Sequence, residues 1–109
     1  MNIESQIVET KALLTCTGRM DAVSAPRFEA ACTELLGQGH ANLVADLSGL
    51  EYISSAGLRS ILASGKKLKV SGGSLAFCGL FGMVDEVFRV SGFMKLFRVH
   101  ASATEALEG

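Results

Sequence analysis

The chain has 109 residues, of which 49% are hydrophobic and 19% charged, and its formal net charge is −1. This length suits a single domain over residues 1–109, and a domain of this size buries enough surface to fold without disulfides or a structural metal. Because the charges are balanced and no basic surface is encoded, we expect no nucleic-acid partner.

Apolar runs and glycines divide the chain into alternating strands and helices. Short β-type runs predict strands, and apolar residues at i, i+4 and i+7 predict helices. The expected strands are Ile3–Val8, Ala12–Thr17 (ended by Gly18), Asn42–Leu47, Ser74–Cys78 and Leu96–Val99. The expected helices begin at a Ser24 cap, at Ser54, at Val84 and at a Ser102 cap, and the first three end at Gly37, Val70 and Gly92.

This order, β-β-α-β-α-β-α-β-α, predicts an α/β fold. Repeated strand–helix–strand units imply right-handed crossovers and parallel neighbours. The opening hairpin makes the sheet mixed, with about four to five strands and helices packed on it. Binding sites in such folds gather where strands end and the next helices begin, which directs attention to the segment after Leu47.

Two adjacent hydroxyls, Ser54 and Ser55, lie at the expected start of the second helix. The first N–H groups of a helix have no internal partner, so a serine oxygen can cap them and an added phosphate would be stabilised there. A phosphoryl group brings about −1.5 to −2 charges, enough to reverse the potential of a docking surface. The simpler alternative is that Ser54 is an N-cap worth ~1 kcal/mol and Ser55 an ordinary first-turn residue.

Two further residues of this segment bear on its function. Gly57 weakens the first helical turn by roughly 1 kcal/mol relative to alanine, which favours a position where something approaches the backbone closely. Arg59 lies four residues after Ser55 and could face a phosphate there, with a solvated arginine as the alternative.

Two other clusters have simpler expectations. The lysines of Lys66–Lys69 are expected to form the solvated face of the same helix. Leu80, Phe81 and Met83, near a predicted loop, are expected to pack in the core, with part of a docking surface as the alternative.

The cysteines and the N-terminus bear on the compartment. Cys16, Cys32 and Cys78 are widely spaced among apolar residues with no Cys-x-x-Cys pair, which predicts buried thiols and neither disulfides nor a zinc site. The first residues lack the basic start and apolar run of a signal peptide, and no segment approaches the roughly 20 apolar residues of a membrane helix. We therefore expect a cytoplasmic protein without membrane insertion.

Three motifs, spaced along nearly the whole chain, carry a family resemblance. They are Gly-Arg-Met-Asp-Ala-Val-Ser-Ala-Pro at Gly18–Pro26, Tyr-Ile-Ser-Ser-Ala-Gly-Leu-Arg-Ser-Ile-Leu at Tyr52–Leu62 and Val-Phe-Arg-Val-Ser-Gly-Phe-Met-Lys-Leu-Phe at Val87–Phe97. In this order they resemble the motifs of the STAS domain, found in bacterial anti-sigma factor antagonists and at the cytoplasmic end of sulfate transporters.

The resemblance implies a stand-alone anti-sigma factor antagonist in a phosphorylation-controlled partner switch. In that family the unphosphorylated antagonist binds an anti-sigma factor that is also a serine kinase of the histidine-kinase-like ATPase type, which frees the sigma factor or another target. Phosphorylation at the start of the second helix abolishes this binding, and a separate serine phosphatase restores it.

One position departs from the family pattern. Many members carry a hydroxyl residue directly before the glycine, where this chain has Ala56. The ungapped match puts Ser54 on the family's aspartate and Ser55 on its first hydroxyl, so we predict phosphorylation at Ser55, with Ser54 as the second choice.

Asp21 and Asp46 resemble acidic residues that border the site in the family and help engage the kinase. The alternatives are that Asp21 is a turn residue and that Asp46 is a strand-end residue. The predicted partner-binding residues are Asp21, Asp46, Ser54, Ser55, Ala56, Gly57 and Arg59.

Three other functional classes are an enzyme, an adapter and a small-molecule-binding module. An enzyme is disfavoured because His40 and His100 stand alone and the chain has no nucleophile elbow, zinc-protease motif or phosphate loop, so we expect no catalytic residue, cofactor or metal. A non-phosphorylated STAS adapter that binds an ATPase or transporter partner is the main alternative, and Ala56 favours it. A module that binds a nucleotide or other small molecule at the same helix start is a third class.

Overall fold

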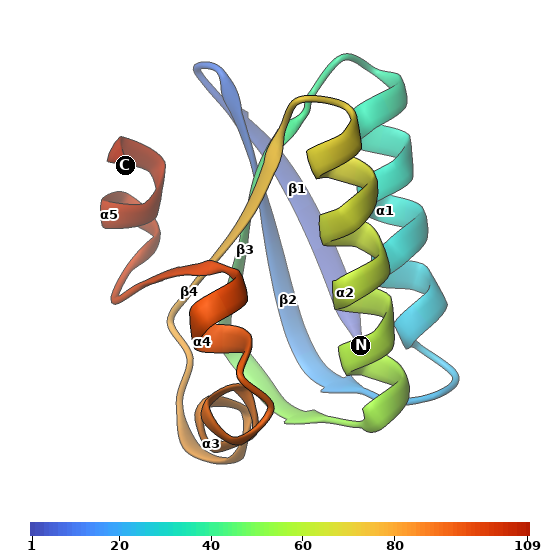
Figure 1. The fold of residues 1–109 in the computed structure, drawn as a ribbon, viewed down its shortest axis with the longest axis vertical. Coiled ribbons are helices and arrows are strands. Elements are labelled where there is room, and N and C mark those ends of the chain that lie inside the picture. The colour runs from blue at the N-terminus through green and yellow to red at the C-terminus, as the bar shows by residue number, and fades with distance from the viewer.

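Five strands form one mixed sheet in a computed structural model that describes residues 1–109 (Figure 1). The strands lie side by side in chain order: β1 Asn2–Val8, β2 Lys11–Met20, β3 Asn42–Ile53, β4 Ser74–Cys78 and β5 Arg98–His100. β1 is antiparallel to β2, and every other neighbouring pair is parallel. The predicted α/β class and the mixed sheet with an opening hairpin are therefore confirmed.

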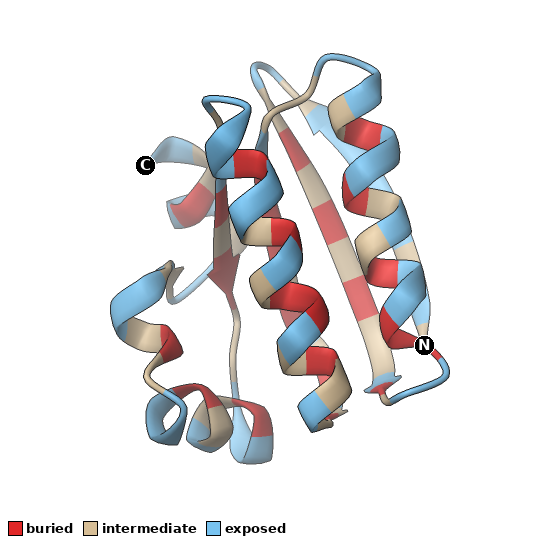
Figure 2. Cartoon of the chain, turned by 45° about the vertical axis from the view of Figure 1, so that its right-hand side comes forward, coloured by how far each residue is buried: buried red, intermediate tan, exposed pale blue.

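Helices cover both faces of this sheet. They are α1 Ala25–Gly37, α2 Ser55–Val70, α3 Gly82–Val90, α4 Phe93–Leu96 and α5 Ala103–Glu108. Figure 2 shows α1 and α2 side by side in front of the sheet with their buried residues turned toward it, and α5 lies behind the sheet. Ala106 of α5 packs in a separate small cluster with Val44 and Cys78, which places α5 on the opposite face.

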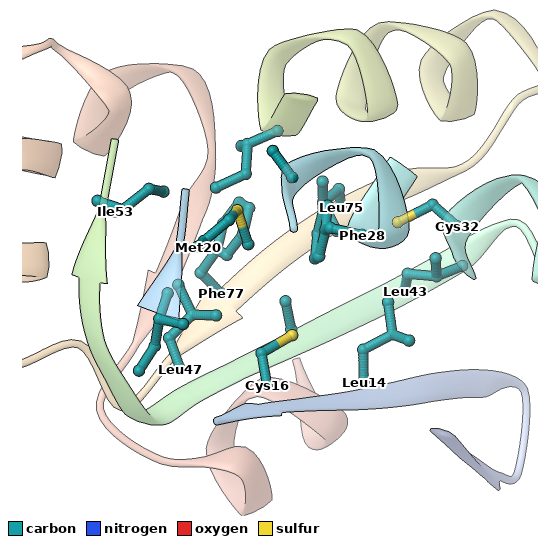
Figure 3. Packing of buried hydrophobic residues seen from close by; sticks show 14 of the residues in the cluster. Leu14, Cys16, Met20, Phe28, Cys32, Leu43, Leu47, Ile53, Leu75 and Phe77 are labelled. Carbon is teal, nitrogen blue, oxygen red and sulfur yellow. The ribbon is translucent and has the colours of Figure 1, made fainter. Parts of the chain in front are cut away.

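The main core lies between the sheet and the two long helices. Along β2, alternate residues are buried, as expected for a strand with one face in the core. Figure 3 shows Leu14 and Cys16 of β2 pointing toward the helix layer that supplies Phe28 and Cys32. All three cysteines are free and buried, as predicted.

Several predicted boundaries differ from the structure. β2 does not end before Gly18 but continues to Met20, because its last residues pair with the second half of β3. Gly18 itself has a φ of +97° beside a register shift in this pairing. β3 runs six residues past the predicted end at Leu47, since its second half pairs with the extended β2. Residues 93–96 form the short helix α4, so the last strand starts at Arg98 and not at Leu96.

The expected cap of α1 is also different. Ser24 occupies the N-cap position, but its side chain makes no capping hydrogen bond to the helix. Its backbone angles (φ −89°, ψ −23°) are already helical, and its hydroxyl oxygen accepts instead from the backbone N–H of Asp21 at 2.9 Å. By contrast, Ser54 and Ser102 do cap α2 and α5, accepting from the N–H groups of Gly57 and Glu105.

Candidate functional site

The pairing of β2 with β3 brings two distant segments of the chain together. Met20 pairs with Ile53, and the backbone N–H of Ser54 donates to the Met20 carbonyl at 2.9 Å. Figure 3 shows Met20 and Ile53 at the same end of the core. The start of α2 is thereby fixed to the end of β2, and Asp21 follows directly on that strand.

The two serines at this start have different environments. The Ser54 hydroxyl oxygen accepts from the backbone N–H of Gly57 at 3.1 Å, and this side chain is half-buried. Ser55, the first residue of α2, is exposed and its hydroxyl makes no hydrogen bond. The capping interpretation therefore holds for Ser54, whereas the Ser55 hydroxyl is free to react or to contact a partner.

Gly57 allows the helix to approach the strand. A Cβ at this position would lie 2.7 Å from Cγ1 of Ile53 and 3.2 Å from the carbonyl oxygen of Met20. The latter is a backbone atom that cannot turn aside as a side chain can. What approaches Gly57 closely is thus the paired ends of the chain's own β2 and β3.

Asp21 forms a tight turn between β2 and α1. Its Oδ1 accepts from the backbone N–H groups of Ser24 at 3.0 Å and Val23 at 3.1 Å, and the Ser24 Oγ lies 3.1 Å away. These hydrogen bonds, those of Ser24 foremost, lower the pKa of the Asp21 carboxyl below its ordinary value of 3.8. The turn interpretation is confirmed, and an ionised carboxylate stands beside the start of α2.

Asp46 does not border this site. It lies on β3 opposite Thr15, seven residues before the strand ends at Ile53, on the order of 20 Å away along an extended chain. Its Oδ1 accepts from the backbone N–H of Ser48 at 3.0 Å. The predicted grouping of Asp46 with the serines is wrong because β3 continues past the position where it was expected to end.

The backbone at the α2 start favours a negative group, although the neighbouring Asp21 carboxylate opposes one. The first turn of α2 contains no acidic residue, and the backbone N–H groups of Ser55 and Ala56 donate to no backbone acceptor. Arg59 is exposed and takes part in no ion pair. Unpaired N–H groups and the helix dipole together stabilise an anion at such a position.

Exposed apolar side chains at this end of the molecule were missed or misassigned. Val23, on the loop after Asp21, is 86% exposed. Phe81 and Met83, expected in the core, are 47% and 39% exposed at the start of α3, which Figure 1 places at the same end as the start of α2. Only Leu80 packs partly against the core. The apolar chemistry at this end favours a partner protein's surface.

A stacked pair lies near the end of the β2–β3 pairing. The Arg19 guanidinium lies 4.1 Å from the centre of the Tyr52 ring, an arrangement that cation–π attraction stabilises. The two residues are 33 positions apart and meet only through β2–β3 pairing. No local sequence signal could have joined them.

The chain offers neither a cluster of metal-ligating side chains nor a membrane-spanning helix. No group of three or more histidine, cysteine, aspartate or glutamate side chains is close enough together to hold a metal ion. None of the helices combines the length and apolarity needed to cross a membrane.

Comparison with known proteins identifies similar chains. The family model of the STAS domain matches residues 2–106. The candidate anti-sigma factor antagonist BtrV of Bordetella bronchiseptica is 40% identical over 95 residues, which cover 86% of this chain and 81% of BtrV. The anti-sigma-F factor antagonist RsfB of Mycobacterium tuberculosis is 29% identical over 100 residues, covering 90% of this chain and 80% of RsfB. The crystal structure of a candidate anti-sigma factor antagonist from Thermotoga maritima has the same fold, with a TM-score of 0.90, 23% identity and coverage of 97% and 92%.

Proposed function

The chain belongs to the STAS domain family, and we propose that it is an anti-sigma factor antagonist whose docking is switched by phosphorylation of Ser55. The unphosphorylated chain binds an anti-sigma factor that is also a serine kinase of the histidine-kinase-like ATPase type. This binding releases the sigma factor or another target. A serine phosphatase resets the phosphorylated chain, and all of these steps take place in the cytoplasm.

We choose Ser55 over Ser54 because the two hydroxyls differ in hydrogen bonding and in exposure. The Ser54 oxygen is committed to the N–H of Gly57 and half-buried, so its phosphorylation would remove the cap of α2. The Ser55 hydroxyl is exposed on the first turn and has no competing bond. It can enter a kinase active site while α2 stays folded.

Phosphorylation transfers the γ-phosphoryl group of ATP to the Ser55 oxygen. The Ser55 oxygen attacks the γ-phosphorus of ATP in the kinase, the bond to the bridging oxygen of ADP breaks, and the hydroxyl proton leaves to a base or to solvent. The phosphatase uses water to release inorganic phosphate and restore the hydroxyl. The net charge of the chain changes from −1 to about −3 in the phosphorylated state.

The added charge falls on the proposed docking surface. This surface combines Ser55 and Arg59 with the exposed apolar side chains of Val23, Phe81 and Met83. A phosphate here would be held by the free N–H groups at the start of α2, and it would have to lose its hydration when a partner docks. The cost of removing water from this double charge, which the N–H groups offset only in part, opposes docking and gives the switch its direction.

Mass spectrometry of the full chain after incubation with the cognate kinase and ATP tests the proposal. We expect one added phosphoryl group, located by fragmentation at Ser55. Ser55→Ala should gain none, whereas Ser54→Ala should still be phosphorylated although it loses ~1 kcal/mol of stability. Addition at another residue, or none at all, would refute the phosphorylation switch.

A constitutive adapter is the second candidate, and Ala56 favours it. This residue stands where many relatives carry a hydroxyl, and here it is half-buried and packs against the core. An adapter would bind an ATPase or transporter partner through the same surface without covalent modification. The absence of phosphorylation together with binding to such a partner would support it.

A further inference from the structure

A groove lies along the free edge of β4, between the carboxyl-terminal half of α2 and the short elements α4, β5 and α5. Its volume is about 830 Å³. β5 pairs only with Ala76–Cys78, so Ser74 and Leu75 have no strand beside them on that side. Figure 1 shows this first part of β4 extending past α4 toward the far end of α2. Extended backbone without a neighbouring strand therefore borders the groove.

The floor of the groove is apolar. Leu62 of α2, Leu75 of β4 and the Phe97 ring line it, and Leu96 at its rim is 61% exposed. Phe97 lies directly on Gly65, where a Cβ would come within 2.6 Å of Cε1 of the ring. Gly65 thus makes room for the edge of the aromatic ring against α2.

The walls of the groove are basic. Lys66 and Lys69 of α2 stand on one side and Arg98 of β5 on the other, and none of the three takes part in an ion pair. Lys11 also lines the groove, but its amine is bonded to the backbone carbonyls of Ala106 and Gly109. No aspartate or glutamate side chain lines the groove, and the Gly109 oxygen is bonded to Lys11, so no acidic side chain faces the three free cations.

We propose that this groove binds an extended acidic segment of a partner protein, with carboxylates on the three free cations and apolar side chains on the floor. Edges of sheets bind peptides in extended form, in which alternate side chains point to opposite sides. Because the cations stand on both walls, they match charges spread along a segment better than one small anion. The α2 residues that line the groove lie roughly 10–20 Å along the helix from Ser55, so this contact is separate from the proposed switch.

A titration with a designed peptide tests the proposal. The probe is a fluorescein-labelled octapeptide of alternating glutamate and valine, added to the full chain and followed by fluorescence anisotropy. We expect saturable binding that weakens at least about tenfold in the double variant Lys66→Glu and Lys69→Glu, because two attractions become repulsions. Lys67→Glu is the matched control: Lys67 is exposed on the same helix but bonds Thr33 at 3.0 Å and does not line the groove.

Location and ligand class are checked in the same experiment. Amide shifts at Gly65, Leu75 and Phe97 should move with the peptide, and Ser55→Asp should bind it as the unmodified chain does. The proposal fails if no saturable binding occurs at millimolar peptide, if Lys67→Glu weakens binding as much as the double variant, or if a lysine–valine peptide binds equally well. Displacement of the peptide by inorganic phosphate or decanoate at matched concentration would instead assign the groove to a small anion or an amphiphile.

Discussion

At Gly57, the lack of a side chain lets the start of α2 lie against the carbonyl of Met20. We predict that Gly57→Ala lowers the free energy of unfolding by about 1–3 kcal/mol, because the added methyl must displace the Ile53 side chain and crowd the Met20 carbonyl. The matched control is Gly37→Ala at the end of α1, where a Cβ would meet nothing within 4 Å. Urea unfolding of both variants measures the difference, and equal stabilities would contradict the contact.

The lowered pKa of Asp21 predicts that the stability of the fold depends on pH. Its folded pKa is lowered by hydrogen bonds from Ser24, so its contribution to stability is present above the unfolded pKa and is lost as the pH falls through the folded value. Between about pH 6 and about pH 3 the unmodified chain should therefore lose more stability than Asp21→Asn. An NMR titration of Ser24→Ala, which loses the Oγ–H hydrogen bond but keeps the backbone N–H bond to Oδ1, should show a smaller lowering of the Asp21 pKa. An unchanged titration in Ser24→Ala would exclude the Ser24 hydroxyl as a cause.

At the scale of elements, the reactivity of the three thiols depends on which strands and helices must move to expose them. Burial raises the pKa of Cys16 on β2 and Cys32 on α1 to about 12, and that of Cys78 on β4 to about 11. Native thiol labelling near pH 8 should therefore be slow and should require local opening. Cys78 should react first, because only α5 and the three-residue β5 need to move. Earlier labelling of Cys32, under the long helices, would contradict this order.

The sequence predicted most elements and missed those that depend on distant contacts. The strands and long helices carry clear apolar periodicity and terminal glycines. The second half of β3 contains Ser48 and Gly49, which are typical of turns, and it is extended only because β2 lies beside it. Helix α4 spans four residues, too few for a helical period. Ser24 looked like a cap because the backbone angles that turn its side chain away are not visible in a sequence.

At the scale of the whole molecule, the pairing of distant strands brings the residues of the candidate site together. Ser54, Ser55 and Gly57 could be placed at a helix start from their local sequence alone. Whether Asp21 or Asp46 lies beside them depends on where β2 and β3 end, which local patterns did not determine. The parallel pairing of those strands brings Asp21 close and leaves Asp46 near the middle of the sheet. The exposed Val23 and Phe81 likewise become neighbours of the site only in the folded chain.

The central claim is that a phosphate on Ser55 prevents docking on the anti-sigma factor. Isothermal titration of the cognate anti-sigma factor with the unmodified chain and with the Ser55-phosphorylated chain tests it most directly. Ser71→Asp, with its charge at the opposite end of α2, is the control for net charge and should bind as the unmodified chain does. We predict a loss of affinity of at least about 100-fold on phosphorylation of Ser55, or about 2.7 kcal/mol. Equal affinity of the two forms would contradict the switch.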